Sequence, residues 1–370
     1  MPDITFTVLV DNTPASPEIM EAIQEVYVEN NVDMADVFRL RIAIGRNGQG
    51  DWTTLEDDPF QPLTPIALHI QLDTGASESL ISGYVTSQQT QISSEPGQSF
   101  LEVVGMDATV LMNLEDKIVA WPNLADSDIA TKIFGDYGFV SQVDQTQPAR
   151  QEQDTTTLQR STDIQFLRQL AKRNGFECYV ERDPIQNVDI GHFHSPRLQD
   201  NPQGTLAVSF GEETSISSFR TSYEMLRPIR AKASNIDIYT QSTQNSDVQS
   251  GSLIELGRTP LHERLPRQPL ILVSKTALES TTELQAFCQG LVDRSIWAIT
   301  AQGQLNTAVY GGILRAHQTV NIRGAGNLYS GTYYVTRVLH SFVGDSYTQH
   351  FKLKRNAIGL IGSENFTSLL

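Results

Sequence analysis

Residues 320–356, VNIRGAGNLYSGTYYVTRVLHSFVGDSYTQHFKLKRN, predict three strands that follow one another closely. Apolar and aromatic residues alternate with polar ones in these runs, and glycines separate the runs. Such alternation is typical of antiparallel strands with one buried face, and glycine is favoured in the turns between them. The preceding segment 305–313, LNTAVYGGI, predicts a further strand. The end of the chain is therefore expected to be rich in β-strands.

Residues 1–113 show the same alternation and predict a first antiparallel β-barrel or sandwich. The expected strands are residues 1–10, 37–45, 66–73, 80–92 and 100–112. Between the first two strands, Ser16 and Pro17 predict the start of a helix, because serine caps a helix N-terminus and proline fits its first position. An apolar stripe extends this expected helix over Ile19, Met20, Ile23, Val26 and Tyr27.

Residues 114–204 predict an α/β domain. A first helix is expected to begin with Asp126 or Ser127 as its N-cap. The polar segment 143–162 is interpreted as a solvated loop. A second helix follows and is expected to end at Gly175, directly before an aromatic strand. Helix and strand should therefore pack as one unit.

The rest of the chain is predicted to be β-rich, with a helix inserted between its strands. A polar run at 240–252 is interpreted as an exposed loop, and residues 281–301 predict a helix. The remaining segments are, in chain order, a β-rich segment, an inserted loop and helix, a second β-rich segment and a C-terminal tail: residues 205–240, 241–301, 302–357 and 358–370.

Composition excludes several classes of protein. The chain has 370 residues, more than one core usually supports, and a formal net charge of −16. That acidic balance argues against stable nucleic-acid binding by the general surface. No apolar run is long enough to span a membrane, and the first residues lack a signal-peptide pattern, so neither direct membrane insertion nor export is indicated. The cysteines Cys178 and Cys288 are far apart among apolar neighbours, which predicts packed thiols in a protein assembled in the cytoplasm.

Residues 71–83, QLDTGASESLISG, contain the Asp-Thr-Gly-Ala sequence that surrounds the catalytic carboxylate of aspartic proteases. That chemistry needs two carboxylates sharing a proton, so a protease would have to be a homodimer built around Asp73. The alternative is a tight turn between two strands, where glycine adopts positive φ and aspartate bonds nearby amides. We favour the turn. Asp73→Asn should then leave assembly intact, whereas a β-branched residue at Gly75, if its φ is positive, should cost ~1 kcal/mol or more of stability.

Two histidines are the candidate metal ligands. His192 and His194 lie two residues apart on a predicted strand, so they share a face, but no third ligand is indicated. The glycine-rich segment 45–50, GRNGQG, lacks the lysine and hydroxyl of a phosphate-binding loop and is interpreted as a turn. Asp57 and Asp58 precede a proline and are interpreted as solvated turn acids. The sequence therefore predicts no catalytic, cofactor-binding or metal site.

Two stretches resemble the baseplate hub proteins of phage tails, the group of late-control protein D and VgrG. The C-terminal stretch is similar to the ending of that family at Gly331, Tyr333, Val335, Val338, His340, Tyr347, Thr348, Phe351, Arg355 and Asn356. The second stretch resembles the family's helix leading into an aromatic strand, at Asp163, Phe166, Leu167, Leu170, Ala171, Gly175, Phe176 and Tyr179. Residues 80–83 are also similar to a strand of the family's first barrel.

The resemblance implies a β-rich α+β fold with two small antiparallel barrels joined by α/β elements. It implies that the second barrel is discontinuous, with residues 205–240 and 302–357 as its two parts and residues 241–301 as the insertion that joins the α/β domain. It implies a homotrimer whose six barrels form a pseudo-hexameric ring that adapts a hexameric inner tube to a trimeric spike. It implies a structural protein of a phage tail or contractile injection particle, without enzymatic activity or cofactors, and a strand role for His340. The partners implied are an inner tube protein, a separate spike, and baseplate wedge or tail-tube initiator proteins.

Two alternatives stay open from the sequence. An aspartic protease using Asp73 would show pepstatin-sensitive cleavage that Asp73→Asn abolishes. A β-sandwich adhesin that binds glycans through its exposed Thr, Ser and Gln loops would bind sugars without forming oligomers. The copy number of the chain in purified particles distinguishes both alternatives from a hub.

Overall fold

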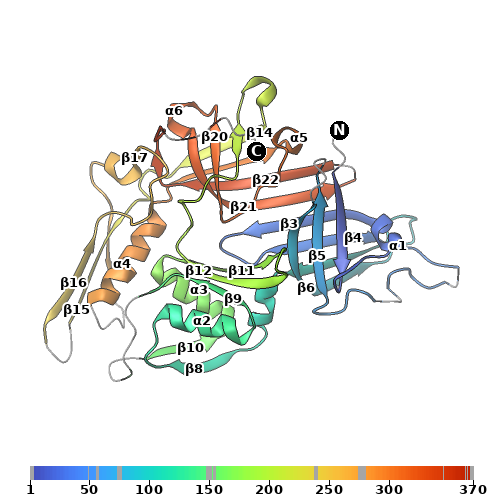
Figure 1. Cartoon of the computed structure of the whole chain (residues 1–370), viewed down its shortest axis with the longest axis horizontal. Coiled ribbons are helices and arrows are strands. Elements are labelled where there is room, and N and C mark those ends of the chain that lie inside the picture. The colour runs from blue at the N-terminus through green and yellow to red at the C-terminus, as the bar shows by residue number, and fades with distance from the viewer. Residues whose placement is uncertain are drawn as a thin grey trace.

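The protein is described by a computed structural model that covers residues 4–48, 50–55, 58–72, 77–146, 152, 156–236, 241–273, 281–344, 346–362, 364 and 366. The fold is β-rich with fewer helices, so the predicted α+β class is confirmed. Figure 1 shows the first strands at one end of an elongated molecule, the last long strands across its top, helices α2 (Asp126–Asp136) and α3 (Asp163–Asn174) below, and α4 (Thr281–Ser295) at the other end.

An N-terminal β unit is formed by six strands and a short hairpin partner. Its elements are β1 (Thr5–Val10), β2 (Thr13–Pro14), α1 (Pro17–Ala22), β3 (Ile23–Asn31), β4 (Val37–Ala43), β5 (Pro65–Gln71), β6 (Ser77–Gln91), β7 (Phe100–Met106) and the 3₁₀ helix η1 (Ala108–Asn113). The strands pair antiparallel in the order β3-β4-β7-β6-β5-β1-β2. Alternate residues such as Phe38, Leu40 and Ile42 are fully buried in its core, which explains the alternation in the sequence.

A C-terminal β unit contains six strands from the end of the chain and from its middle. Its elements are β13 (Thr205–Ala207), η2 (Gly211–Glu213), β14 (Ile216–Tyr223), β19 (Ile299–Leu305), α5 (Thr307–Tyr310), β20 (Thr319–Arg323), α6 (Gly326–Tyr329), β21 (Gly331–Val343) and β22 (Ser346–Arg355). The order β14-β19-β22-β21 is antiparallel, β20 also pairs with β21, and β13 lies parallel to β20. The core of this unit includes Tyr333, Val335 and Phe351.

The two β units are not separate bodies, because strand β3 pairs antiparallel with β21 from Val343↔Glu25 to Arg337↔Asn31. This pairing joins both units into one sheet of 13 strands. The resemblance implies two β units joined by α/β elements, and the structure adds a direct strand pairing between them. Alternation specifies which face of a strand is buried, but it does not specify which strand becomes the neighbour.

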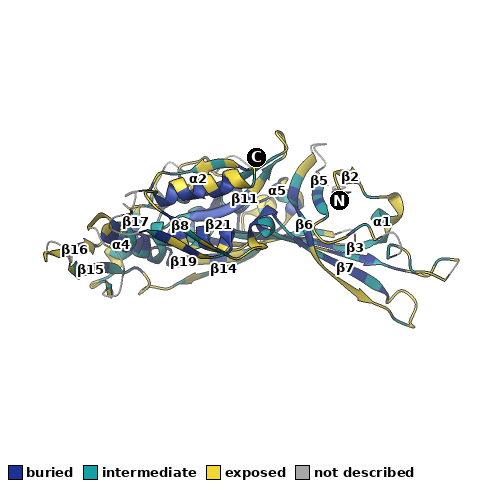
Figure 2. Cartoon of the chain, turned by 90° about the horizontal axis from the view of Figure 1, so that it is seen from below, coloured by how far each residue is buried: buried dark blue, intermediate teal, exposed yellow. Residues whose placement is uncertain are grey.

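The α/β domain packs two helices against small sheets beneath the joined β units (Figure 1). Its strands are β8 (Lys117–Trp121), β9 (Val140–Val143), β10 (Thr157–Ser161), β11 (Glu177–Asp183) and β12 (Val188–His194). Strands β11, β12 and β9 form one sheet, and β8 pairs with β10. In Figure 2, α2 turns an exposed face outward and a buried face inward, as an amphipathic helix should.

The insertion between β14 and β19 forms its own layer with helix α4. Its elements are β15 (Arg230–Ile236), β16 (Thr243–Val248), β17 (Thr259–Pro260), η3 (Leu261–Arg264) and β18 (Leu270–Val273), and β17 pairs with the late strand β23 (Ala357–Ile358). The sheet order is β16-β15-β18. Leu284, Cys288 and Val292 on α4 are fully buried against it. A helix-containing insertion thus lies between strands β14 and β19 of the C-terminal unit, while the predicted domain division stays a prediction.

Helix boundaries differ from the sequence predictions at three places. Helix α1 begins as expected after Ser16, but it ends at Ala22, and Ile23, Val26 and Tyr27 belong to strand β3. Their apolar spacing fits a helix and a strand about equally well over so short a run. Helix α4 ends at Ser295, before the predicted end at residue 301, because the chain enters β19 there.

The first turn of α2 also differs from the expectation. Ala125 is the N-cap, rather than Asp126 or Ser127. The carboxylate of Asp128 accepts a hydrogen bond of 3.1 Å from the amide of Ala125, so an acid in the first turn supplies the cap. The Asp126 and Ser127 side chains instead contact the neighbouring helix and loop.

Four segments have a different secondary structure from the one predicted. The polar segments 143–162 and 240–252 contain β10 and β16, although both were expected to be loops. The segment 305–313, expected to be a strand, contains the helical turn α5, and the end of 100–112 forms η1. In β10 the buried Gln159 bonds Trp121 Nε1 at 3.1 Å, so polar contacts replace the apolar alternation on which prediction depends.

Candidate functional site

The junction of the two β units is held on its outer face by a bidentate ion pair. Arg337 of β21 donates from Nε and Nη2 to the two carboxylate oxygens of Glu29 on β3, each at 2.6 Å. The hydrogen bond from Arg337 lowers the pKa of Glu29, and that from Glu29 raises the pKa of Arg337. Both side chains are partly exposed, so the pair orients the two strands more than it stabilises them.

His340 lies inside the same junction and is fully buried. Its Nε2 is 3.2 Å from Asn30 Oδ1 on β3, and its Nδ1 is 2.8 Å from the hydroxyl of Tyr347 on β22. Burial, and then the charge of Arg315, lower the pKa of His340 well below its ordinary value. A neutral imidazole therefore connects three strands, and the interpretation of His340 as a packed, hydrogen-bonded strand residue is confirmed.

Two carboxylates lie beside this junction. Asp36, in the turn between β3 and β4, accepts hydrogen bonds from Asn30 Nδ2 at 2.7 Å and from the amide of Asn31 at 2.8 Å. Its own amide donates to Asp107 Oδ2 at 2.7 Å. Burial, and then the charge of Asp107, raise the pKa of Asp36 to about 7, and burial also raises the pKa of Asp107. The pair is therefore disposed to hold a proton near neutral pH.

The α/β domain contacts the C-terminal β unit through Glu177. One carboxylate oxygen accepts from the Tyr334 hydroxyl at 2.5 Å and lies 3.1 Å from His317 Nδ1, and the other lies 3.7 Å from Lys354 Nζ. Burial disfavours the charged carboxylate, but the hydrogen bond from His317 and the charge of Lys354 outweigh it and hold the pKa of Glu177 at about 2. Glu177 is thus an ionised link between two parts of the chain.

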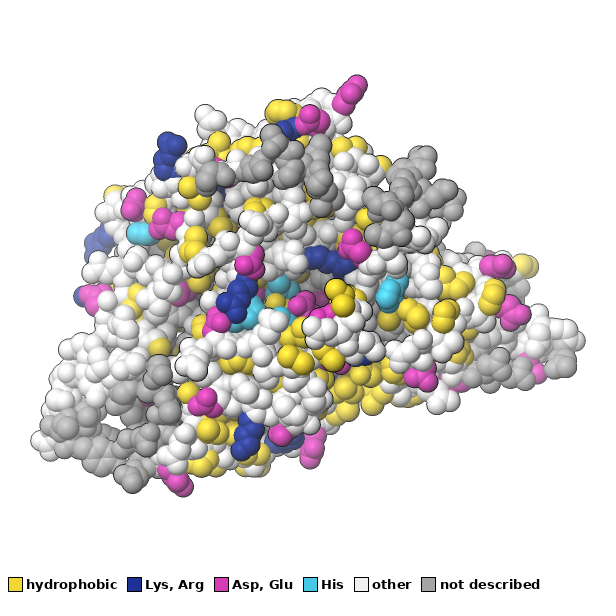
Figure 3. All heavy atoms as spheres, viewed as in Figure 1, with side chains coloured by type: hydrophobic (Ala, Val, Ile, Leu, Met, Phe, Trp, Pro, Cys, Tyr) yellow, Lys and Arg dark blue, Asp and Glu magenta, His cyan; other side chains and the backbone are white. Residues whose placement is uncertain are grey.

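Tyr179 extends this contact as an aromatic stack. Its ring lies between His192 of the α/β domain, 4.3 Å away between ring centres, and His317 of the C-terminal unit, 3.6 Å away. In Figure 3, histidine, basic and acidic side chains gather near the centre of the molecule, where β11 and β12 meet the large sheet in Figure 1. This region joins the α/β domain to the C-terminal β unit through stacked rings and paired charges.

The two candidate metal ligands lie close together, but they contact each other. His192 Nδ1 lies 3.2 Å from His194 Nε2, His192 Nε2 lies 3.0 Å from Glu181, and His194 Nδ1 lies 2.8 Å from the carbonyl oxygen of Ser195. Within the part of the chain that the structure describes, no three His, Cys, Asp or Glu side chains are grouped to hold a metal ion. The ring nitrogens serve protein contacts here.

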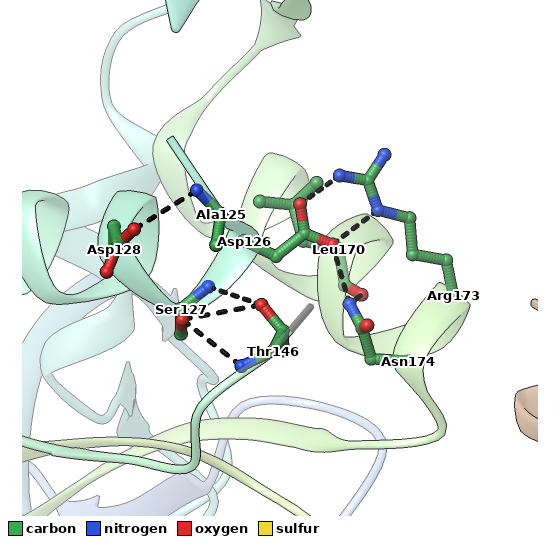
Figure 4. A network of polar contacts seen from close by, with 8 residues as sticks. All are labelled: Ala125, Asp126, Ser127, Asp128, Thr146, Leu170, Arg173 and Asn174. Carbon is green, nitrogen blue, oxygen red and sulfur yellow. Dashed lines mark hydrogen bonds and ion pairs between the residues drawn. The ribbon is translucent and has the colours of Figure 1, made fainter. Parts of the chain in front are cut away.

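A second polar network holds the α/β domain together (Figure 4). The Asp126 carboxylate accepts from the guanidinium of Arg173 and from Asn174 Nδ2, the latter at 2.6 Å. Ser127 and Thr146 exchange hydrogen bonds, with the Ser127 amide 3.0 Å from Thr146 Oγ1. The start of α2 is thereby tied to the end of α3 and to the loop after β9, so the domain is a rigid support for β11 and Glu177.

The suspected protease loop lies outside the described residues at Asp73 and Gly75. Its flanks are described, and β5 pairs antiparallel with β6 up to Gln71↔Ser77, so the loop connects the two strands of a hairpin as predicted.

The glycine-rich segment is a turn in its described part, where the Asn47 amide donates a hydrogen bond of 2.8 Å to the Asp51 carbonyl. Asp57 also lies outside the described residues. Asp58 accepts a hydrogen bond from Gln88 Nε2 at 3.2 Å.

Both cysteines are free, buried thiols, which confirms their predicted packing role. Burial raises the pKa of Cys178 to about 12 and also raises that of Cys288, so neither thiol is activated as a nucleophile.

None of the helices in the described ranges combines the length and the apolar character that crossing a membrane would require.

The junction residues were missed by sequence analysis because nothing marks them as a group. Glu177, His317 and Lys354 come from three distant segments, and each has ordinary strand or turn neighbours. Asp36 and Asp107 do carry a weak signal, since each stands alone beside an apolar strand end, but turn acids commonly do. Only the strand pairing brings these side chains together.

Residues 2–343 match the family model described as the Alg8 N-terminal domain. The chain belongs to this family. The match includes both β units up to the end of β21, and therefore the whole β3–β21 junction. A search of curated proteins finds no match.

Several solved structures share the fold. The 43 kDa tail protein of prophage MuSo2 from Shewanella oneidensis is 12% identical with a TM-score of 0.67, and the alignment covers 96% of this chain and 99% of that chain. A tail protein from Neisseria meningitidis MC58 is 13% identical with a TM-score of 0.65, covering 95% and 97%. An Escherichia coli component of the type VI secretion system is 12% identical with a TM-score of 0.54, covering 95% and 76%. At such identities the likeness establishes the fold.

Proposed function

We propose that the chain is the structural baseplate hub of a contractile injection machine, either a phage tail or a phage-tail-like particle. In this role it adapts the hexameric inner tube to a trimeric spike and forms part of the central channel. The observation that carries the proposal is the joining of two six-stranded β units through the β3–β21 pair. Three copies would present six such units, which matches a six-fold tube on one side and a three-fold spike on the other.

The arrangement of strands within each unit supports this role. Outward from the junction, the order is β3-β4-β7-β6 on one side and β21-β22-β19-β14 on the other, so each unit presents a similar four-stranded antiparallel wall. Strand β14 ends the sheet on one side, and β2 ends it on the other. Exposed edges of this kind are usually protected by pairing or covering, and a closed ring would do so.

The outer face at the junction is a candidate wall of the channel. It carries charges of both signs that pair with each other, including Arg41 with Glu25 at 3.6 Å, Arg39 with Glu102 at 3.7 Å, and Arg337 with Glu29. Such mutual pairing leaves few free cations to hold a polyanion. A wall of this kind would let cargo pass without stable nucleic-acid binding.

The comparisons support the same class of particle. Two of the similar structures are described as tail proteins, and the third as a type VI secretion component with structural similarity to the T4 tail proteins gp27 and gp5. The partners we propose are an inner tube protein, a separate spike, and baseplate wedge or tail-tube initiator proteins. Assembly would take place in the cytoplasm, without direct membrane insertion. None of the contacts among the described residues favours the protease or the adhesin.

The copy number of the chain tests the proposal. Native mass spectrometry of the purified chain should give a species of three times 41.1 kDa, and electron microscopy of particles should place three copies beside a six-fold tube. A chain that stays monomeric at micromolar concentration, and that occurs in six copies or in none within purified particles, would contradict the hub.

A further inference from the structure

A cleft of about 610 Å³ lies between the outer face of the C-terminal β unit and the α/β domain. Its floor is formed by β14, β19 and β22, and its wall by the α3–β11 turn and the end of α4. Hydroxyl and amide side chains such as Ser222, Thr300 and Gln302 line the floor. The volume falls within the range of clefts that bind ligands or short peptide segments.

The cleft is cationic although the chain has a net charge of −16. Five basic side chains line it, Arg220, Arg227, Arg294, Lys352 and Lys354, against three carboxylates, Asp33, Glu177 and Asp293. Two of the carboxylates are already bound. The Glu177 carboxylate is paired with Lys354 and accepts a hydrogen bond from Tyr334. Asp293 accepts hydrogen bonds from the amide and the hydroxyl of Ser252 at 2.6 and 2.7 Å.

Arg220 and Lys352 are the lining cations whose side chains have no hydrogen bond or ion pair among the described residues. Both are exposed, and Lys352 acts on Glu29 only through the longer-range attraction of its charge. A charge on an edge strand discourages aggregation, which would account for Arg220 on β14. That reason does not apply to Lys352, because β22 is internal to the sheet. The two unpaired cations therefore point to an external counter-charge.

The strand register sets their spacing. Arg220 and Lys352 both lie opposite Gln302 of β19, so they occupy one row two strands apart. Two strand spacings are about 10 Å, which is close to three residues of a polyproline II segment at about 3.1 Å each. Because that extended conformation has three residues per turn, carboxylates three residues apart share one face and would match this row.

The lining favours a peptide over a nucleic acid. A single-stranded nucleic acid binds through exposed aromatic faces on which bases stack. Trp297 is only 5% exposed, and Lys354 Nζ covers its ring at 4.4 Å from the ring centre. A polyphosphate would also be repelled by the acidic chain as a whole, whereas a peptide with two carboxylates meets less repulsion.

We propose that this cationic cleft binds an extended segment of a partner protein carrying two carboxylates three residues apart. The carboxylates contact Arg220 and Lys352, and the segment's backbone contacts the polar floor. This inference stands on the cleft alone and does not depend on the hub assignment.

Fluorescence anisotropy on the full chain tests the proposal. The probes are labelled twelve-residue peptides with two Glu separated by one, two, three or four positions, each with a twin in which both Glu are Gln. The i, i+3 peptide should bind at least about tenfold tighter than its twin. Arg220→Gln and Lys352→Gln should each weaken its binding by about tenfold. Arg160→Gln, an exposed unpaired arginine on β10, is the matched control and should change nothing.

Three results would overturn the proposal. The first is that no Glu peptide of the panel binds tighter than its Gln twin. The second is that binding survives both Arg220→Gln and Lys352→Gln while their melting temperatures match the parent. The third is that the oligonucleotide dT12, inorganic phosphate or unlabelled copies of the chain displace the peptide at lower concentration than the unlabelled peptide does.

Discussion

Glu177 and Asp36 are both carboxylates at a junction between parts of the chain, but their surroundings shift their pKa values in opposite directions. Glu177 is contacted by His317, Tyr334 and Lys354, and its pKa falls to about 2. Asp36 is contacted by the amide groups of Asn30 and Asn31 and lies beside the like charge of Asp107, and its pKa rises to about 7.

The difference shows that burial alone does not decide the charge of a junction carboxylate. Burial is the largest single influence on both pKa values and opposes ionisation at both sites. At Glu177 the contacts with His317 and Lys354 together outweigh it, whereas at Asp36 the charge of Asp107 adds to it. A cation and donors fix Glu177 in one charge state at all ordinary pH values. The Asp36 carboxylate is contacted by amide groups rather than by a cation, and it changes its charge near neutral pH. The two junctions should therefore respond differently to mutation and to pH.

Glu177→Gln should have the largest effect on stability. The substitution leaves Lys354 partly buried without its counter-charge, and losing one partner of a buried pair typically costs about 3 kcal/mol or more in the free energy of unfolding. Urea unfolding at pH 7 measures the loss. The pKa shift predicts its pH dependence. The contribution of ionised Glu177 is complete above its ordinary value of 4.5 and disappears as the pH falls towards 2, so parent and variant should converge there.

Glu181→Gln is the matched control for this prediction. Glu181 lies four residues further along β11, and its side chain is 57% exposed. The same change there should cost less than about 1 kcal/mol, as is usual for exposed pairs. Equal losses at positions 177 and 181 would contradict the special role of Glu177.

Asp36→Asn should remove a pH dependence of the opposite sign. The native pKa of about 7 exceeds the ordinary 3.8, so the stabilisation is complete below pH 3.8 and is lost as the pH rises through 7. Because Asp36 is partly exposed, we expect the parent to lose about 2 kcal/mol between pH 4 and pH 8 from this group, less than the full shift implies. Urea unfolding across that range measures the slope, which should flatten in the variant.

Asp33→Asn controls for a general effect of removing an acid, because Asp33 is exposed on the same turn. Its stability profile should follow that of the parent. If Asp36→Asn follows the parent as well, the carboxylate of Asp36 does not hold a proton at neutral pH and the contrast with Glu177 fails.

Most long strands of the fold could be predicted from the sequence, because one buried face imposes alternation. Strands β4, β5, β21 and β22 lie where Phe38, Leu68, Val338 and Phe351 point into a core, and their periodicity is clear. Strand β16 could not be predicted in this way. Only Ser246 and Val248 face α4, and Ser246 is held by a 2.7 Å hydrogen bond to Gln285 rather than by apolar packing.

The junctions could not be predicted for a different reason. Pairing of β3 with β21 brings together residues more than 300 positions apart, such as Asn30 and His340, and no local pattern records a contact at that separation. The metal hypothesis shows the reverse case. The sequence correctly placed His192 and His194 on one strand face, but it could not show that each histidine would bond the other.

The smallest effect on stability is expected at the exposed face of the β3–β21 junction, where Arg337→Met removes the bidentate ion pair with Glu29. Arg337 and Glu29 are 33% and 25% exposed, so water replaces much of the lost interaction, and we expect a loss of about 1 kcal/mol in urea unfolding. Arg39→Met, which breaks the longer 3.7 Å contact to Glu102 on the same face, should cost less than Arg337→Met. If Arg337→Met instead costs as much as Glu177→Gln, the β3–β21 junction depends on its outer ion pair rather than on the buried strand contacts around His340.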